Sequence, residues 1–317
     1  MFARQLSPNL TGALCAMVAA AFFSVNDMAI KFLSGDFALH QVVLIRSVVG
    51  MFVWAIVVMP LSGGWKTVKT KRPVMHLLRG FCVVFANMCF FLGLAAMPLA
   101  EAVAIFFISP LIITVFSVVF LGEKVGPWRW GAIALGMIGV IVMMKPGGAT
   151  FQMAAILPLL AATGYAFLHI LTRKIGKTES AATMLFYIQL TFIGTSALIG
   201  ILLGNGRFAG SADPSLEFLT RSWSMPTGND WWILLAIGVG SSGGGYLISQ
   251  AYRLSEAAFA APFEYLAMPL AILWGVLVFG EWPDIRAWSG IALIIGSGLV
   301  LLWREALGKK LLSRKTP

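Results

Sequence analysis

Ten apolar runs, each long enough to cross a membrane as a helix, set the strongest limit on what this chain can form. A hydrocarbon core about 30 Å thick requires roughly 20 apolar residues per helix. The runs lie near residues 10–33, 38–60, 74–97, 100–120, 127–145, 152–172, 181–203, 230–252, 258–280 and 286–304. They lack the polar and apolar alternation of outer-membrane barrel strands. With 59% hydrophobic and 11% charged residues, the composition predicts an all-α integral membrane protein with ten transmembrane helices.

The distribution of basic residues predicts how these helices are oriented. The formal net charge is +10. If the N-terminus is cytoplasmic, 16 Lys and Arg residues fall in cytoplasmic segments and four fall outside, namely Lys145, Arg207, Arg221 and Arg286. This asymmetry follows the positive-inside rule, so we expect both termini in the cytoplasm. Residues 307–317 form a basic cytoplasmic tail, for which we expect membrane lipids rather than nucleic acid as the partner.

The sequence contains none of the common motifs for catalysis, metal binding or nucleotide binding. Its three cysteines lie within apolar runs and are expected to pack there. "GVGSSGGGY" at residues 238–246 begins with the glycine spacing of a dinucleotide site, but that site requires a preceding strand, and this segment lies within an apolar run. We expect these glycines to let neighbouring helices approach closely or to let the helix unwind. We expect no cofactor, no metal and no enzymatic activity.

The chain repeats itself. "FLGEKVGPWRWGAIAL" at residues 120–135 matches "VFGEWPDIRAWSGIAL" at residues 278–293 with an offset of 158, so that Glu123 corresponds to Glu281. A weaker match with an offset of 142 pairs Lys31 with Arg173. These matches predict two five-helix repeats, residues 10–145 and 152–306. Because five is odd, the second repeat enters the membrane from the opposite side, and inverted repeats are typical of secondary transporters.

These features resemble a known family. The doubled "GE" turn followed by Trp, Arg46 within the second run, and "AYRLSEAA" leading into "PFEYLAMPLAILWGVLVFGE" together resemble the drug/metabolite transporter superfamily, EamA type, over residues 10–306. The resemblance implies a transporter of a small organic solute in a bacterial-type inner membrane, as a monomer or homodimer.

We therefore expect alternating access, driven by protons or by exchange. Carboxylates and aromatic residues in the spans favour a cationic or zwitterionic solute, such as an amino acid derivative or a quaternary amine, or a flavin-like or nucleoside-like ring. The alternative is an integral-membrane enzyme that acts on a lipid or an isoprenoid. It is disfavoured because the sequence has no cluster of acidic residues or His near one membrane face.

Charged groups inside membrane spans are costly and therefore indicate function. Glu264, between Pro262 and Pro269, is expected to bind a cationic group or to carry a proton, unless it forms an internal ion pair with Arg253 or with another helix. Arg46 is expected to brace the fold, with binding of a substrate carboxylate or phosphate as the alternative. Asp27, four residues before Lys31 on one helix face, could pair with it and act in gating.

Other candidates are placed by their polarity and by the repeat. His169 could carry protons, although a core histidine is the favoured interpretation. The four glutamates at matching positions of the two repeats are expected to cap helices or to stabilise turns: Glu101, Glu256, Glu123 and Glu281. The remaining expected substrate-binding residues are Asn87, Tyr165, Gln189, Ser242, Tyr246, Tyr265 and Trp274. Residues 204–229 form the only long connector predicted.

Overall fold

The computed structural model describes residues 8–144, 153–293, 295–297 and 300, and all regular secondary structure within these ranges is helical. The elements are α1 (Pro8–Leu33), α2 (Leu39–Val53), η1 (Trp54–Val58), α3 (Met59–Leu61), η2 (Gly64–Val68), α4 (Pro73–Ala96), α5 (Leu99–Phe106), α6 (Ser109–Leu121), α7 (Pro127–Met144), η3 (Met153–Ala155), α8 (Ile156–Ile175), α9 (Ala181–Leu203), α10 (Pro214–Thr220), α11 (Asp230–Leu254), α12 (Ala257–Ala260), η4 (Ala261–Leu266) and α13 (Ala267–Phe279). A further apolar helix covers Ile285–Ser297.

The described helices overlap the predicted apolar runs, and the all-helical class is confirmed for the described residues. Seven described helical stretches are long and apolar enough to cross a membrane: Pro8–Leu33, Leu39–Leu61, Pro73–Ala96, Leu99–Leu121, Ile156–Ile175, Ala181–Leu203 and Asp230–Leu254. Three shorter apolar helices, Trp130–Gly139, Phe263–Phe279 and Ile285–Ser297, occupy the other runs. The count of ten spans and the inverted topology stay predictions. The basic tail at 307–317 lies outside the described residues.

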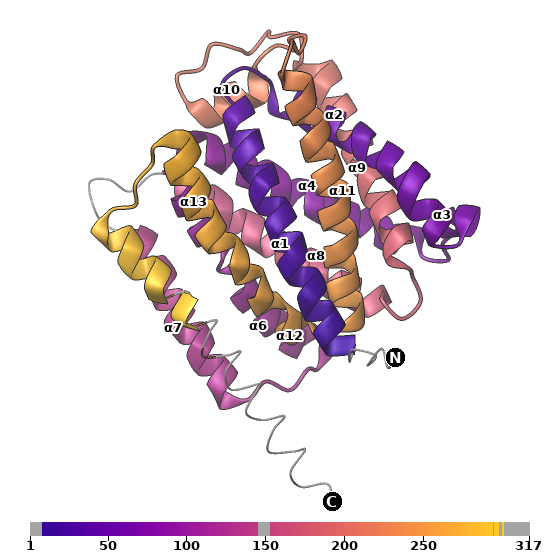
Figure 1. The fold of residues 1–317 in the computed structure, drawn as a ribbon, viewed down its shortest axis with the longest axis vertical. Coiled ribbons are helices and arrows are strands. Elements are labelled where there is room, and N and C mark those ends of the chain that lie inside the picture. The colour runs from indigo at the N-terminus through magenta and orange to yellow at the C-terminus, as the bar shows by residue number, and fades with distance from the viewer. Residues whose placement is uncertain (1–7, 145–152, 294, 298–299, 301–317) are drawn as a thin grey trace, which may run out of the picture.

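The bundle is built on long helix pairs that come from opposite ends of the sequence. In Figure 1, α1 (indigo) runs beside α11 (orange) across the front of the molecule. Behind them α4 packs on α8, while α2 contacts both α9 and α11. The glycine-rich segment stays helical throughout, so the unwinding considered from the sequence does not occur. Its glycines instead permit close approach, because a Cβ on Gly238 would lie 2.5 Å from the side chain of Val49.

Two of the helical stretches are broken within their first half. The first breaks at Phe107 and Ile108, between α5 and α6. The second contains η4, a short 3-10 segment, between α12 and α13. Proline explains this loosening, because Pro262 and Pro269 lack the backbone N–H that a continuous helix needs. The two breaks meet, since the rings of Phe107 and Tyr265 lie 5.3 Å apart.

The long connector at residues 204–229 is packed against the ends of the helices rather than detached from them. It includes the short helix α10, seen above α1 in Figure 1. The guanidinium Nη1 of Arg221 donates to the backbone oxygen of Ser34 over 3.0 Å, and Nε2 of Gln41 donates to the backbone oxygen of Ser224 over 2.5 Å. These bonds fix the connector to the segment after α1 and to the first turn of α2.

Candidate functional site

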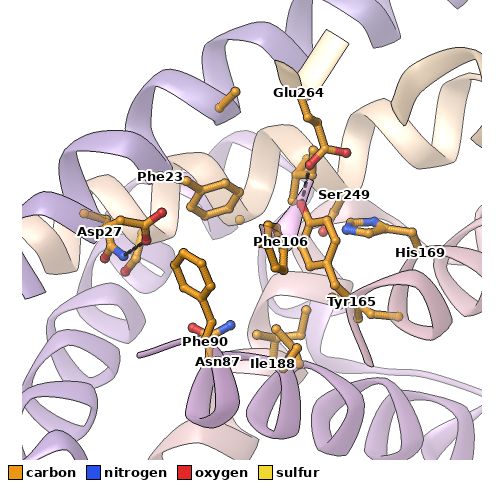
Figure 2. Close-up of a pocket in the computed structure, with 18 of the residues that line it drawn as sticks. Phe23, Asp27, Asn87, Phe90, Phe106, Tyr165, His169, Ile188, Ser249 and Glu264 are labelled. Carbon is orange, nitrogen blue, oxygen red and sulfur yellow. Dashed lines mark hydrogen bonds between the residues drawn. The ribbon is translucent and has the colours of Figure 1, made fainter. Parts of the chain in front are cut away.

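A cavity of about 140 Å³ lies within the helix bundle, next to both broken helices. Side chains from α1, α2, α4, α5, α8, α9, α11 and η4 contribute to its wall. Figure 2 shows the rings of Phe23, Phe90, Phe106 and Tyr165 around its centre, with Asp27 and Glu264 at separate sides. The cavity therefore combines an aromatic wall with two carboxylates.

Glu264 accepts more hydrogen bonds than Asp27, the other acidic residue of the cavity wall. Glu264 lies in η4 and is 7% exposed. The Tyr165 hydroxyl donates to its Oε2 over 2.5 Å, and the Tyr252 hydroxyl donates to Oε1. The ion pair with Arg253 considered from the sequence does not form, because Nε of Arg253 donates to Oε1 of Gln250 over 2.7 Å instead. Two hydroxyl donors offset part of the cost of burying this carboxylate, so it can be kept in the cavity without a protein cation beside it.

His169 lines the cavity between the same two tyrosines. Its ring centroid lies 3.8 Å from that of Tyr252, nearly parallel, and 4.1 Å from that of Tyr165, edge to face. The side chain is 1% exposed, and neither ring nitrogen has a hydrogen-bond partner among the described residues. Stacking therefore holds the imidazole in place next to the Glu264 network, while both of its nitrogens are left for other partners.

Arg46 and Asn87 form the polar part of the opposite wall. Arg46 is 4% exposed, and its Nη2 donates to Oδ1 of Asn87 over 3.2 Å. Its guanidinium also lies over the rings of Phe91 and Phe192, 5.6 and 5.0 Å from their centroids. Both roles considered for Arg46, bracing and substrate binding, stay predictions, because the same side chain contacts Asn87 and lines the cavity. Asp27 lies nearby on α1, where it accepts a 3.2 Å hydrogen bond from Nδ2 of Asn26.

Lys31 does not pair with Asp27, so the intrahelical pair considered from the sequence is wrong. Its Nζ instead lies 2.6 Å from Oε1 of Glu281. A partner 250 positions away in the sequence thus replaces a partner four positions away. The reason lies in the geometry of the bundle, where Asp27 faces the cavity and Lys31 lies at the end of α1, beside the start of α5.

Glu281 and Glu123 each cap a broken helix from the other half of the sequence. Oε2 of Glu281 accepts a 2.9 Å hydrogen bond from the backbone N–H of Leu99, where α5 begins. Oε1 of Glu123 accepts a 3.2 Å bond from the backbone N–H of Ala257, where α12 begins, and lies 3.7 Å from Nε of Arg173. The capping expected of Glu256 is not seen, because its side chain makes no cap hydrogen bond.

Four predicted site residues are placed away from the cavity wall. Ser242 donates to the backbone oxygen of Gly50 over 3.2 Å and so joins α11 to α2. Tyr246 accepts a 3.3 Å bond from Nε2 of Gln250. Tyr265 and Trp274 pack in or against the hydrophobic core. By contrast, the wall includes Glu264, Asp27, Arg46, Asn87, Tyr165, His169 and Gln189.

Sequence reasoning missed Arg79 and the phenylalanine residues of the wall. Arg79 lies on α4, is 1% exposed and lines the cavity. Arg79 occurs near the start of an apolar run, where an arginine can extend toward the membrane surface, so its position in the sequence does not show that it faces the cavity. Within the described ranges, no group of three or more His, Cys, Asp or Glu side chains is placed to hold a metal ion.

Comparison with known proteins places this arrangement in a family. The pattern of the EamA-like transporter family matches residues 10–145 and 152–303. The chain belongs to the EamA-like transporter family. It is 29% identical to a riboflavin transporter from Vibrio cholerae, over 90% of this chain and 91% of that protein. It is also 29% identical to an S-adenosylmethionine uptake transporter from Rickettsia felis, over 98% of this chain and 97% of that protein.

A solved crystal structure supports the fold independently. Its TM-score against this EamA-like chain is 0.67, with 21% sequence identity, and the match covers 93% of this chain and 98% of the other. Membership of the family and the seven long apolar helices together make the protein a multi-pass membrane protein.

Proposed function

We propose that the protein is a secondary transporter that moves a small organic metabolite across the inner membrane by alternating access, coupled to protons or by exchange. The solute is cationic or zwitterionic, or it carries a flavin-like or nucleoside-like ring. The observation that carries this proposal is the cavity between the two broken helices, whose wall joins aromatic rings to the buried carboxylate of Glu264. Discontinuous helices that meet at a central cavity are the usual setting for substrate binding in secondary transporters.

The chemistry of the wall fits this class of solute. Rings of Phe23, Phe90 and Phe106 offer faces and edges on which a flat heterocycle can stack. Glu264 and Asp27 offer negative charge to an ammonium or sulfonium group. Riboflavin contains a fused three-ring system, and S-adenosylmethionine contains a purine, a sulfonium and an amino acid group. The names of the two relatives are therefore compatible with the same kind of wall.

Alternating access is supported by contacts that occur twice. Glu281 and Glu123 differ by 158 positions, and so do Ala257 and Leu99, whose N–H groups they accept. Leu99 and Glu123 lie at opposite ends of one membrane-length stretch, so these two capping contacts lie at opposite ends of the bundle. In alternating access one end of the transporter opens while the other stays closed, and this requires equivalent contacts, such as these two caps, at both ends.

Counterflow in proteoliposomes tests the proposal. Vesicles loaded with unlabelled S-adenosylmethionine or riboflavin should transiently accumulate the labelled compound from outside, and the compound should be recovered unchanged. Glu264→Gln should abolish accumulation of labelled S-adenosylmethionine by the folded protein, because an amide has no charge with which to bind its cationic groups. Glu217→Gln, in the exposed connector, is the matched control and should keep wild-type rates. Wild-type vesicles that accumulate no ring-bearing amine, amino acid derivative, flavin or nucleoside would refute the proposed solute class.

A further inference from the structure

Arg79 places a second guanidinium at the cavity wall, and not all of its N–H groups have a hydrogen-bond partner. Its Nε donates to Oγ1 of Thr172 over 3.0 Å. Its Nη1 is buried and has no hydrogen-bond partner among the described residues. A buried donor without a partner is costly, and a charged one especially so. We therefore expect a hydrogen-bond acceptor on a molecule that enters the cavity to pair with this N–H group.

No carboxylate of the described residues accepts a hydrogen bond from Nη1 of Arg79. Glu179 has other partners, because its Oε1 accepts a 2.8 Å hydrogen bond from Thr70, and its Oε2 lies 3.5 Å from Nε2 of His76. No ion pair within 4.0 Å joins it to Arg79 in the described part of the chain. Arg79 therefore differs from Arg46, whose Nη1 and Nη2 both face asparagine oxygens.

Thr172 orients the guanidinium toward the cavity. Its hydroxyl donates to the backbone oxygen of Leu168 over 2.8 Å, which leaves an oxygen lone pair directed at Nε of Arg79. Thr172 also lines the cavity wall. With Nε anchored in this way, the rigid plane of the guanidinium fixes where the remaining N–H groups point, and no rotation is needed when an anion arrives.

We infer that Arg79 binds an oxyanion of the transported solute, a carboxylate or a phosphate. The inference rests on the proposed function and narrows it: the solute carries an anionic group at the Arg79 side of the cavity, and its cationic or ring portion contacts Glu264 and the phenylalanine rings. Guanidinium groups recognise carboxylates and phosphates through parallel N–H donors. A zwitterion, or a ring compound with a phosphate, satisfies both ends of the cavity.

Matched pairs of ligands that differ in one anionic group test this assignment. The first pair is S-adenosylmethionine and its decarboxylated form, and the second is riboflavin 5′-phosphate and riboflavin. Dissociation constants are measured by titration of the purified protein in detergent, with thermal unfolding as the check that each variant is folded. In at least one pair, the wild type should bind the anionic member about 10- to 100-fold more tightly, the range for a hydrogen bond to a charged group.

The variants decide whether Arg79 is responsible. Arg79→Gln should reduce that preference to within about twofold, whereas Arg79→Lys, which keeps the charge but loses the planar fork, should retain part of it. Arg221→Gln is the matched control, because that arginine pairs with Glu217 in the connector, and it should keep the full preference.

Each failure has a separate meaning. Equal wild-type affinities within both pairs would overturn the inference while leaving the proposed function intact, and no variant is needed for that result. An undiminished preference in a folded Arg79→Gln protein would also overturn it, and would assign Arg79 to bracing. Wild-type protein that binds none of the four compounds would overturn the proposed solute class and, with it, the inference.

Discussion

Replacing Glu281 should open the bundle at one end, and replacing Glu123 should open it at the other. In the structure, Glu281 receives Nζ of Lys31 at 2.6 Å and the N–H of Leu99 at 2.9 Å. Glu281→Gln keeps the size of the side chain and one acceptor oxygen but removes its charge. The contacts that hold α1, α5 and the start of the tenth helical run together are weakened, while the cavity wall is unchanged.

The magnitude follows from the two bonds. A hydrogen bond to a charged group contributes about 1.5–3 kcal/mol and a neutral one about 0.5–1.5 kcal/mol, so neutralising the acceptor of two bonds removes about 2–3 kcal/mol. We take the lower figure, because the side chain of Glu281 is 26% exposed and solvent screens the pair. At tenfold per 1.4 kcal/mol, 2 kcal/mol shifts the equilibrium between closed and open forms at that end by about 30-fold.

Chemical labelling from one side of the membrane measures this shift. A cysteine is introduced at Ser249, on the cavity wall, in a protein whose three native cysteines are replaced by alanine. A membrane-impermeant thiol reagent is then added to either face of sealed vesicles. Glu281→Gln should accelerate labelling about 30-fold from the face at which Glu281 lies and slow it from the other face. Glu123→Gln should do the reverse.

If both substitutions accelerate labelling from the same face, or if neither changes the rate, then Glu281 and Glu123 do not hold opposite ends of the bundle closed. Glu217→Gln serves as the control for a surface carboxylate. It removes an i,i+4 pair with Arg221 in the connector and should leave both labelling rates within about twofold of the wild type.

Other predictions concern stability. Gly238→Ala should lower the free energy of unfolding by about 1–3 kcal/mol, because its Cβ would overlap a valine of α2, whereas Gly240→Ala, with 3.7 Å clearance, should leave the melting temperature unchanged or raised. Ser180→Ala should cost about 1 kcal/mol in thermal unfolding, because it removes the N-cap of α9. The hydrogen bond from the backbone N–H of Gly210 lowers the pKa of Glu217, so the ionised carboxylate stabilises the folded connector. The connector should therefore resist proteolysis above the ordinary glutamate pKa and lose this resistance as the pH falls through the lowered pKa of Glu217. Glu217→Gln should abolish that pH dependence.

The sequence was sufficient to predict the helices, because each apolar run has the length of a membrane span and is bounded by charge, Gly or Pro. The broken helix around Glu264 could also be expected, since two prolines flank it. The repeat pairs Lys31 with Arg173 and Glu123 with Glu281, which are the residues that form the ion pairs at the two ends of the bundle. The sequence could have indicated these ion pairs, but the spacing of four residues favoured Asp27 as the partner of Lys31. Contacts between residues 250 positions apart depend on how the helices pack.

The cavity wall was harder to predict, for a physical reason. Helices that are apolar on every side give no periodic signal to show which face turns inward. Trp274 and Glu264 lie ten positions apart in one run, yet only Glu264 lines the cavity. Likewise, nothing in the sequence distinguishes Arg79, which faces the cavity, from an arginine that extends to the membrane surface.

The exchange of carboxylates between the halves has a consequence for biogenesis. Leu99 in the first half is capped from residue 281, and Ala257 in the second half is capped from residue 123. Each half therefore emerges from the ribosome with one helix end whose native hydrogen-bond acceptor lies in the other half. The cap of α5 can form only after residue 281 has been synthesised, so this end of the bundle is completed late in translation.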